Sequence, residues 1–206
     1  MIGLGAVFTL FFVTLGPLKL LGPFAQQTRQ LDIVALRAIA LRAFAIGLVA
    51  VVVGGYLGTV LAAKWYVSIP ALEIATGLVL FLVAIAVVLA PYEPDPAPPP
   101  PLPEAPMRAT LRLTFPLVVT PYGIAALIAV LATASIDNPS AVTGIYALLV
   151  LVMVLDLLAM LFIREIMRGP VLLILQVLGA VLGVLQVGLA VQIIIRGLRD
   201  LHVLAA

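Results

Sequence analysis

Two ionisable side chains stand inside long apolar stretches of the sequence, where a charge can do chemistry. Lys19 lies between two prolines in VTLGPLKLLGPF (residues 13–24), and Asp156 lies in LVLVMVLDLLAMLF (residues 149–162). A charge at the centre of a membrane helix costs about 2.5–3.5 kcal/mol even on the lenient insertion scale. We expect Lys19 and Asp156 to pair or to share one water-filled cavity, with Asp156 as a structural partner or a protonatable coupling site. Alternatively, the long stem of Lys19 reaches the lipid headgroups.

The other residue types argue against catalysis. Cysteine is absent and the single histidine, His202, lies in the C-terminal tail, so neither a thiol nucleophile nor a Cys/His metal cluster can be built. One intramembrane aspartate does not make a catalytic carboxylate pair. We therefore predict a protein that is not an enzyme and needs no metal or cofactor. The net charge of +2 is small and the basic residues lie between apolar stretches, which does not indicate a nucleic-acid partner.

The elements that must position these charges are membrane helices. The chain is 65% hydrophobic and 10% charged, with a mean hydropathy of +1.32. About 20 apolar residues suffice for a helix to cross a hydrocarbon core roughly 30 Å thick. The sequence predicts an all-α polytopic membrane protein, with the lipid bilayer as its partner. Its six expected transmembrane helices are Ile2–Phe24, Ala38–Ala62, Ser68–Ala90, Ala109–Ala132, Ala141–Ile163 and Val171–Ile195.

A proline-rich segment, Pro91–Pro106, divides the six helices into two groups of three. We expect a first three-helix repeat at 1–90, a proline-rich cytoplasmic linker at 91–108 and a second repeat at 109–206. An odd number of spans in each half means that the two halves enter the membrane in opposite directions. Placing both termini outside puts most arginines on the cytoplasmic side, as the positive-inside rule requires. A docking ligand for a proline-reading module is the alternative reading of the linker.

Prolines interrupt the first span and its counterpart, the fourth. Pro17 and Pro23 lie in the first, and Pro116 and Pro121 lie in FPLVVTPYG of the fourth. Interrupted helices at corresponding places in two halves indicate a transporter binding site near the midplane, although simple kinks are the alternative. The candidate residues for binding a substrate or ion are Thr14, Gly16, Pro17, Lys19, Gly22, Pro23, Pro116, Thr120, Pro121, Tyr122, Gly123 and Asp156. A second tier comprises Glu73, Thr76 and Gln176.

Small and amide residues provide weaker signals. Gly54 and Gly58 form a G-x-x-x-G pair, as do Gly179 and Gly183, and such pairs permit close helix approach within one chain or between chains. A homo-oligomer is therefore one of the two arrangements that these pairs allow. Gln186 adds hydrogen-bonding capacity to the sixth span, where interhelical bonding is its simplest role.

The chain resembles the MarC family of integral membrane proteins. RLTFPLVVTPYGIAALI (Arg112–Ile128) aligns without gaps with the family's P-L-A-I-P-L-L-A-G-P-G-A-I, and the third and sixth spans resemble the family's corresponding helices. Two departures concern the site. The family's D/N-P-x-G-N is here Gly16 to Leu20, and its G-P-G is here Thr120 to Tyr122. The resemblance implies a six-helix inner-membrane protein of prokaryotes, related to amino-acid exporter folds, with a carrier of glycine and alanine among its members.

These features together predict a secondary transporter or exporter of a small polar solute, a small neutral amino acid above all. The N-terminal ends of half-helices would favour its carboxylate, and unwound carbonyls would hold its ammonium group or a cation. The sequence has no ATP-binding motif, so an H⁺ or Na⁺ gradient would drive transport. A channel or a non-transporting membrane scaffold is the alternative.

Overall fold

The structure is a computed structural model that describes residues 4–89, 102, 105–137, 139–168 and 171–203. All regular elements in these residues are helices. Their bounds are α1 Leu4–Thr14, α2 Leu18–Thr28, α3 Ile33–Lys64, α4 Ile69–Leu89, α5 Pro106–Leu113, the π-helical turn η2 Thr114–Val118, α6 Pro121–Asp137, α7 Pro139–Leu161, α8 Ile163–Arg168 and α9 Val171–Asp200. Most of the predicted proline-rich linker falls on 90–101 and 103–104, outside the described residues.

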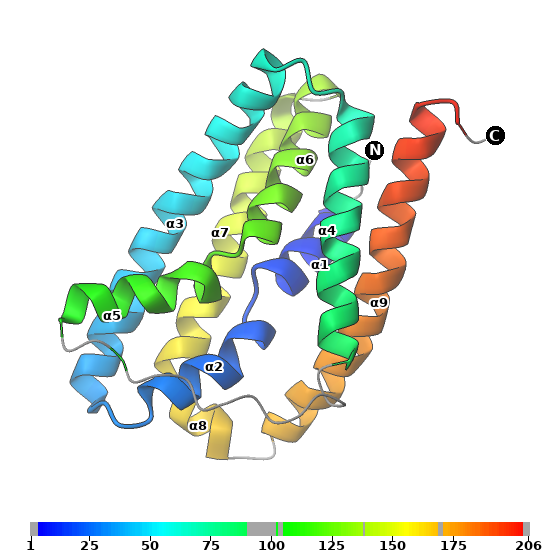
Figure 1. The fold of residues 1–206 in the computed structure, drawn as a ribbon. Coiled ribbons are helices and arrows are strands. Elements are labelled where there is room, and N and C mark those ends of the chain that lie inside the picture. The colour runs from blue at the N-terminus through cyan, green and yellow to red at the C-terminus, as the bar shows by residue number, and fades with distance from the viewer. Residues whose placement is uncertain (1–3, 90–101, 103–104, 138, 169–170, 204–206) are drawn as a thin grey trace.

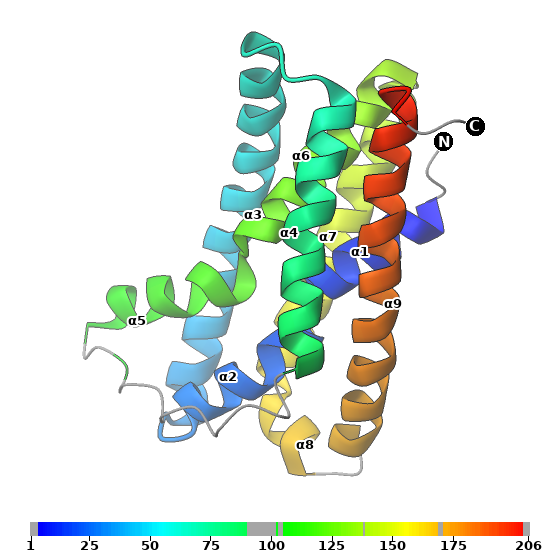
Figure 2. The ribbon, with the colours of Figure 1, turned by 45° about the vertical axis from the view of Figure 1, so that its right-hand side comes forward.

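The long helices form a bundle with the short ones packed into or across it. Helices α3, α4, α6, α7 and α9 run lengthwise, and α4 and α9 lie side by side over most of their length (Figure 1). Helix α5 lies across the lower part of α3 and does not run along the bundle, which is clearest after the 45° turn (Figure 2). The beginning of α1 and the end of α9 lie toward the same end of the bundle.

Fewer than six helices meet a strict test of length and apolarity. Within the described residues four do so, and up to five if the bent pair Pro106–Val118 and Pro121–Ala134 counts as one span. The four are Val7–Thr28, Ile33–Lys64, Ala141–Leu161 and Val177–Asp200, and a shorter apolar helix covers Ile69–Ile85. A polytopic helical membrane protein is therefore confirmed, whereas the six-span inverted repeat stays a prediction.

The first apolar stretch is broken where its first glycine–proline pair stands. Helix α1 ends at Thr14 and α2 begins at Leu18, with Gly16 between them and Pro17 at the N-cap of α2. Proline suits a helix start because its missing amide would be unpaired there anyway. The expectation of a second interruption at Pro23 is wrong. Pro23 lies inside α2, which continues to Thr28 and is held by its buried face.

The fourth apolar stretch is also interrupted. The predicted interruptions of the first and fourth stretches are therefore both present. The two parts of the fourth stretch are bent by 56°. Phe115 has non-helical backbone angles within η2, and Val119 is extended before α6 starts at Pro121. In Figure 1 the two breaks lie at about the same height of the bundle, with α1–α2 running down and α5–α6 running up.

The broken first stretch is the best covered of the candidate spans. Half of the most apolar window of Val7–Thr28 is buried, against 17% for Ile33–Lys64. Phe11, Leu15 and Phe24 are all completely buried. Irregular backbone at membrane depth persists only where protein or water covers it. The chain therefore places its broken segment in the core and leaves α3 and α9 on the outside.

Glycines set the close approaches between long helices. A Cβ on Gly55 or Gly58 would lie 2.6 Å from Leu127 or 2.2 Å from Ile128 on α6, respectively. Gly77 faces the α9 backbone in the same way, since its Cβ would lie 2.9 Å from the Ala190 carbonyl. The predicted role of Gly58 in close packing is confirmed within one chain. No atom within 4 Å would meet a Cβ on Gly179.

The outward faces of α3 and α9 are apolar. Large hydrophobic side chains are exposed along both helices, among them Val34, Leu41, Val49, Val53, Leu57 and Leu61 on α3 and Ile174, Val177, Val181, Val184 and Leu185 on α9. Surfaces of this kind are stable against lipid tails and not against water. They support a multi-pass position in a bilayer.

Gly16→Ala is expected to destabilise the protein, because a Cβ at this position would lie 2.1 Å from the Phe12 carbonyl oxygen. Overpacking against backbone costs about 1–3 kcal/mol or more. Gly22→Ala is the matched control on α2, since its Cβ would meet nothing within 4 Å and alanine favours a helix by about 1 kcal/mol. The measurement is the apparent melting temperature of each purified variant in detergent. Equal melting temperatures for the two variants would contradict the close contact between position 16 and the Phe12 carbonyl.

Candidate functional site

The ammonium group of Lys19 joins the two helix breaks. It donates to the Thr14 carbonyl at 2.7 Å, and it reaches the Val118 carbonyl and the Thr120 hydroxyl, both at 3.4 Å. Thr14 ends α1 and Val118 ends η2, so both carbonyls lack the helical partner that a continuing helix would supply. Lys19 therefore binds backbone carbonyls that both breaks set free. Its ammonium group lies inside the bundle and does not extend to the lipid headgroups.

Thr120 makes the second connection between the breaks. Its hydroxyl donates to the Thr14 carbonyl at 2.9 Å and accepts from the Gly123 amide at 3.1 Å. The second bond makes Thr120 the N-cap of α6, a role for which threonine is well suited. The expectation that Thr120 would satisfy a freed carbonyl is confirmed. The hydroxyls of Thr14 and Thr114 bond instead to carbonyls four residues earlier in their own helices.

The breaks bring helix ends of opposite polarity together. Lys19 lies at the C-terminal end of α1, where the partial negative charge of the helix favours a cation. The N-terminal ends of α2 and α6, at Leu18 and Pro121, begin beside it and carry the complementary positive polarity. Gly123 permits this approach, because a Cβ there would lie 2.3 Å from the Leu15 side chain in the first break.

A small cavity opens beside the joined breaks. Its volume is about 130 Å³, about four times the share of one water molecule in the liquid. The first residue of α2, Leu18, and the second of α6, Tyr122, both line it, with Lys19 between them. The remaining lining residues are Val13, Val83, Gly179, Leu182, Gly183 and Gln186.

Gln186 contributes an unpaired polar group to this cavity. Its side chain is only 5% exposed, and its amide nitrogen Nε2 has no hydrogen-bond partner among the described residues. A buried donor without a partner is costly, so such a group is a candidate ligand contact. A second hollow of about 480 Å³ shares Gln186, Val13 and Leu182 and continues along α9 to Gln192.

Asp156 is the buried charge next to this site. It is completely buried on α7, and neither carboxylate oxygen has a hydrogen-bond partner. Its charge and that of Lys19 interact, but among the described residues no ion pair within 4.0 Å joins them. The direct pairing expected of the two residues is therefore not formed, and Asp156 is not among the residues that line the cavity beside Lys19.

The second-tier candidates lie elsewhere. Glu73, near the start of α4, is 3% exposed and pairs with Arg196 of α9 at 3.3 Å, so it packs against α9 and does not line the cavity. It stands about 15 Å along α4 from Val83 at the cavity. Thr76 donates to the Ala125 carbonyl of α6 at 3.4 Å. The side chain of Gln176 lies outside what the structure describes.

None of the first-tier glycines and prolines lines the cavity, and three of them also lie away from the contacts that join the two breaks. Pro23 is exposed on α2, Gly22 lies beside it in the helix, and Pro116 is exposed within η2. The residues brought together are Thr14, Gly16, Pro17, Lys19, Thr120, Pro121, Tyr122 and Gly123. Sequence reasoning did not place Gln186 or the Val118 carbonyl at the site. An amide in an apolar helix was the available signal for Gln186, and nothing in the sequence indicated Val118.

Comparison with known proteins gives one match. The family model described as MarC family integral membrane protein matches residues 2–202, nearly the whole chain. No curated protein and no solved structure matches this chain.

Thr120→Val is expected to destabilise the joined breaks while Thr120→Ser does not, because only the hydroxyl bonds to Thr14 and Gly123. Loss of an N-cap and of one buried hydrogen bond together costs about 1–3 kcal/mol. Thr28→Val is the matched control, since buried Thr28 bonds only to Phe24 in its own helix. Apparent melting temperatures in detergent decide the matter, and equal losses in both valine variants would contradict the special role of Thr120.

Lys19→Met and Asp156→Leu are expected to be coupled. Each single change leaves the other buried charge without its opposite, whereas the double change strands no charge and loses only the bonds of Lys19 to the freed carbonyls, so its cost should be smaller than the sum of the two single costs. A double-mutant cycle on apparent stability should give a coupling energy of about 0.5–3 kcal/mol. Additivity to within about 0.5 kcal/mol would show that the two charges do not depend on each other.

Proposed function

The chain belongs to the MarC family of integral membrane proteins, and we propose that it is a secondary transporter of a small neutral amino acid. The observation that carries the proposal is the cavity at the joined breaks. It combines a buried ammonium group, two helix N-termini and an unpaired amide donor. Transporters of several folds bind substrates at half-helix ends of this kind. The remaining features of the proposal are six spans as inverted repeats, both termini outside and a prokaryotic inner membrane.

The lining favours a carboxylate at one end of the substrate. The starts of α2 and α6 present positive polarity through Leu18 and Tyr122, and Lys19 adds a positive charge in its protonated form. Gln186 Nε2 adds a donor with no competing partner. Opposite polarity is also close by, in the carbonyls of Thr14 and Val118 and in the carboxylate of Asp156. A zwitterion matches such a pair of polarities.

The size of the cavity limits the substrate. A volume of about 130 Å³ holds about four water-sized groups. Glycine and alanine, with five and six heavy atoms, are the amino acids closest to this limit. The apolar walls, formed by Val13, Val83 and Leu182, suit a hydrogen or a methyl group as the side chain.

Asp156 is the proposed coupling residue. It is completely buried and its oxygens are unpartnered, and an intramembrane carboxylate of this kind marks a proton or ion path in many transporters. A proton or Na⁺ bound to Asp156 would neutralise the carboxylate and weaken its electrostatic attraction to Lys19. Transport would then be driven by the gradient of that ion.

Gln186→Leu tests the proposal. Purified protein in proteoliposomes should exchange labelled alanine or glycine in saturable counterflow, and Gln186→Leu should reduce this exchange by about tenfold, as expected for a lost hydrogen bond to a charged group. Gln30→Leu is the matched control, because Gln30 is exposed in the turn after α2. Unsaturable flux would favour a channel. No flux of either amino acid from folded protein would favour a scaffold and overturn the proposal.

A further inference from the structure

A second pocket lies at the end of the bundle where α2 ends and α8 stands. Its volume is about 640 Å³, and α2, α3 and α8 provide its walls. It is separate from the cavity at the breaks, since the two share no lining residue. Three of its nine lining residues are arginines, Arg29, Arg164 and Arg168, and none is acidic.

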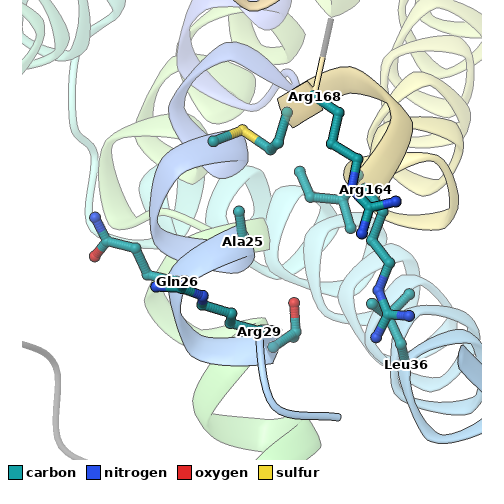
Figure 3. A pocket seen from close by; sticks show the side chains of 9 residues that line it. Ala25, Gln26, Arg29, Leu36, Arg164 and Arg168 are labelled. Atoms are coloured by element: carbon teal, nitrogen blue, oxygen red, sulfur yellow. The ribbon is translucent and has the colours of Figure 1, made fainter. Parts of the chain in front are cut away.

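Arg164 and Arg168 are placed to hold an anion. They stand four residues apart on α8, which puts them on one face of the helix, where two like charges repel each other. Figure 3 shows both side chains reaching along the same side of the pocket. Among the described residues no carboxylate forms an ion pair with either one. An anion between them would remove the repulsion.

The surroundings fix part of this arrangement. Arg164 donates to the Leu31 carbonyl in the turn between α2 and α3, so its guanidinium group is held in position while other donors stay available. Arg29 extends from α2 on the other side of the pocket, near Gln26 (Figure 3). Arg164 is thus the cation held in position, Arg168 lies beside it, and Arg29 lies on the other side of the pocket.

The rest of the wall is apolar and suits an amphiphile. Ala25, Leu36, Ile163 and Met167 line the pocket together with the arginines. Phe162, just before α8, is 54% exposed, as expected where lipid covers the surface. A free inorganic anion would leave this apolar wall unused, whereas an acyl chain would cover it.

We propose that this pocket binds the phosphate group of an anionic phospholipid, with Arg164 and Arg168 on the phosphate and the acyl chain along the apolar wall. Guanidinium groups bind phosphate oxygens in pairs of parallel hydrogen bonds, which a lysine cannot do. Basic pockets between helices at the cytoplasmic surface are common sites for such headgroups. The proposed site is independent of transport, since it uses none of the residues at the breaks.

Arg168→Gln is the decisive variant, because Arg168 is exposed and makes no hydrogen bond or ion pair within the described residues. Arg37→Gln is the matched control, with the same charge change at an exposed position on α3 outside the pocket. Native mass spectrometry of the full chain in detergent would measure binding of phosphatidylglycerol, phosphatidylcholine and inorganic phosphate. Arg168→Lys is the second variant should the glutamine variant fold poorly, since it keeps the charge and loses the paired geometry.

We expect preferential binding of phosphatidylglycerol, weakened about tenfold by Arg168→Gln, less by Arg168→Lys and not by Arg37→Gln, as for the loss of one charge-assisted contact. Equal retention of phosphatidylcholine and phosphatidylglycerol would overturn the proposal. Binding of inorganic phosphate as tight as that of the lipid would overturn the assignment to a lipid. Equal weakening by Arg168→Gln and Arg37→Gln would show a general charge effect and overturn the site.

Discussion

The structure depends on how the carbonyls freed by two helix breaks are satisfied inside an apolar bundle. An unpaired backbone group in such surroundings costs several kcal/mol, because no water replaces the lost partner. Lys19 and Thr120 together bind the freed carbonyl of Thr14, and Lys19 also reaches that of Val118. This requirement explains why the first apolar stretch lies in the core, although it contains a lysine and two prolines. The lysine that seems least suited to the membrane is what makes the breaks stable there.

The same contacts produce the polarity of the candidate site. A break turns one helix into two half-helices, whose ends carry opposite partial charges. Lys19 neutralises the negative ends at Thr14 and Val118, so the positive ends of α2 and α6 are the ones left facing the cavity. Buried Asp156 offsets the charge of Lys19 without bonding to it. The interactions that stabilise the breaks are thus also the basis of the proposed binding of a substrate carboxylate.

Local chemistry explains what the sequence could predict. Pro17 and Pro121 restrict the backbone wherever they stand, so the breaks were predictable, and a lysine among apolar residues had to be buried against acceptors. Pro23 was misjudged because a proline within a helix removes only one hydrogen bond, to the Lys19 carbonyl, and the buried contacts of Leu20 and Phe24 outweigh that loss. The partner of Glu73 and the position of Gln186 depend on which helix faces which, and α9 is hydrophobic almost all round.

Helix α2 connects the two polar regions of the molecule. It begins at the breaks, where Leu18 and Lys19 line the small cavity, and it ends at Thr28 beside Arg29 in the arginine pocket. Its 11 residues span about 16 Å, so a shift of the helix along its axis changes both sites at once. Such a shift must break the bond from Lys19 to Thr14, because that bond fixes α2 to the end of α1. One end of α2 is thus held by Lys19 at the breaks, and the turn after its other end is held by the bond from Arg164 to the Leu31 carbonyl.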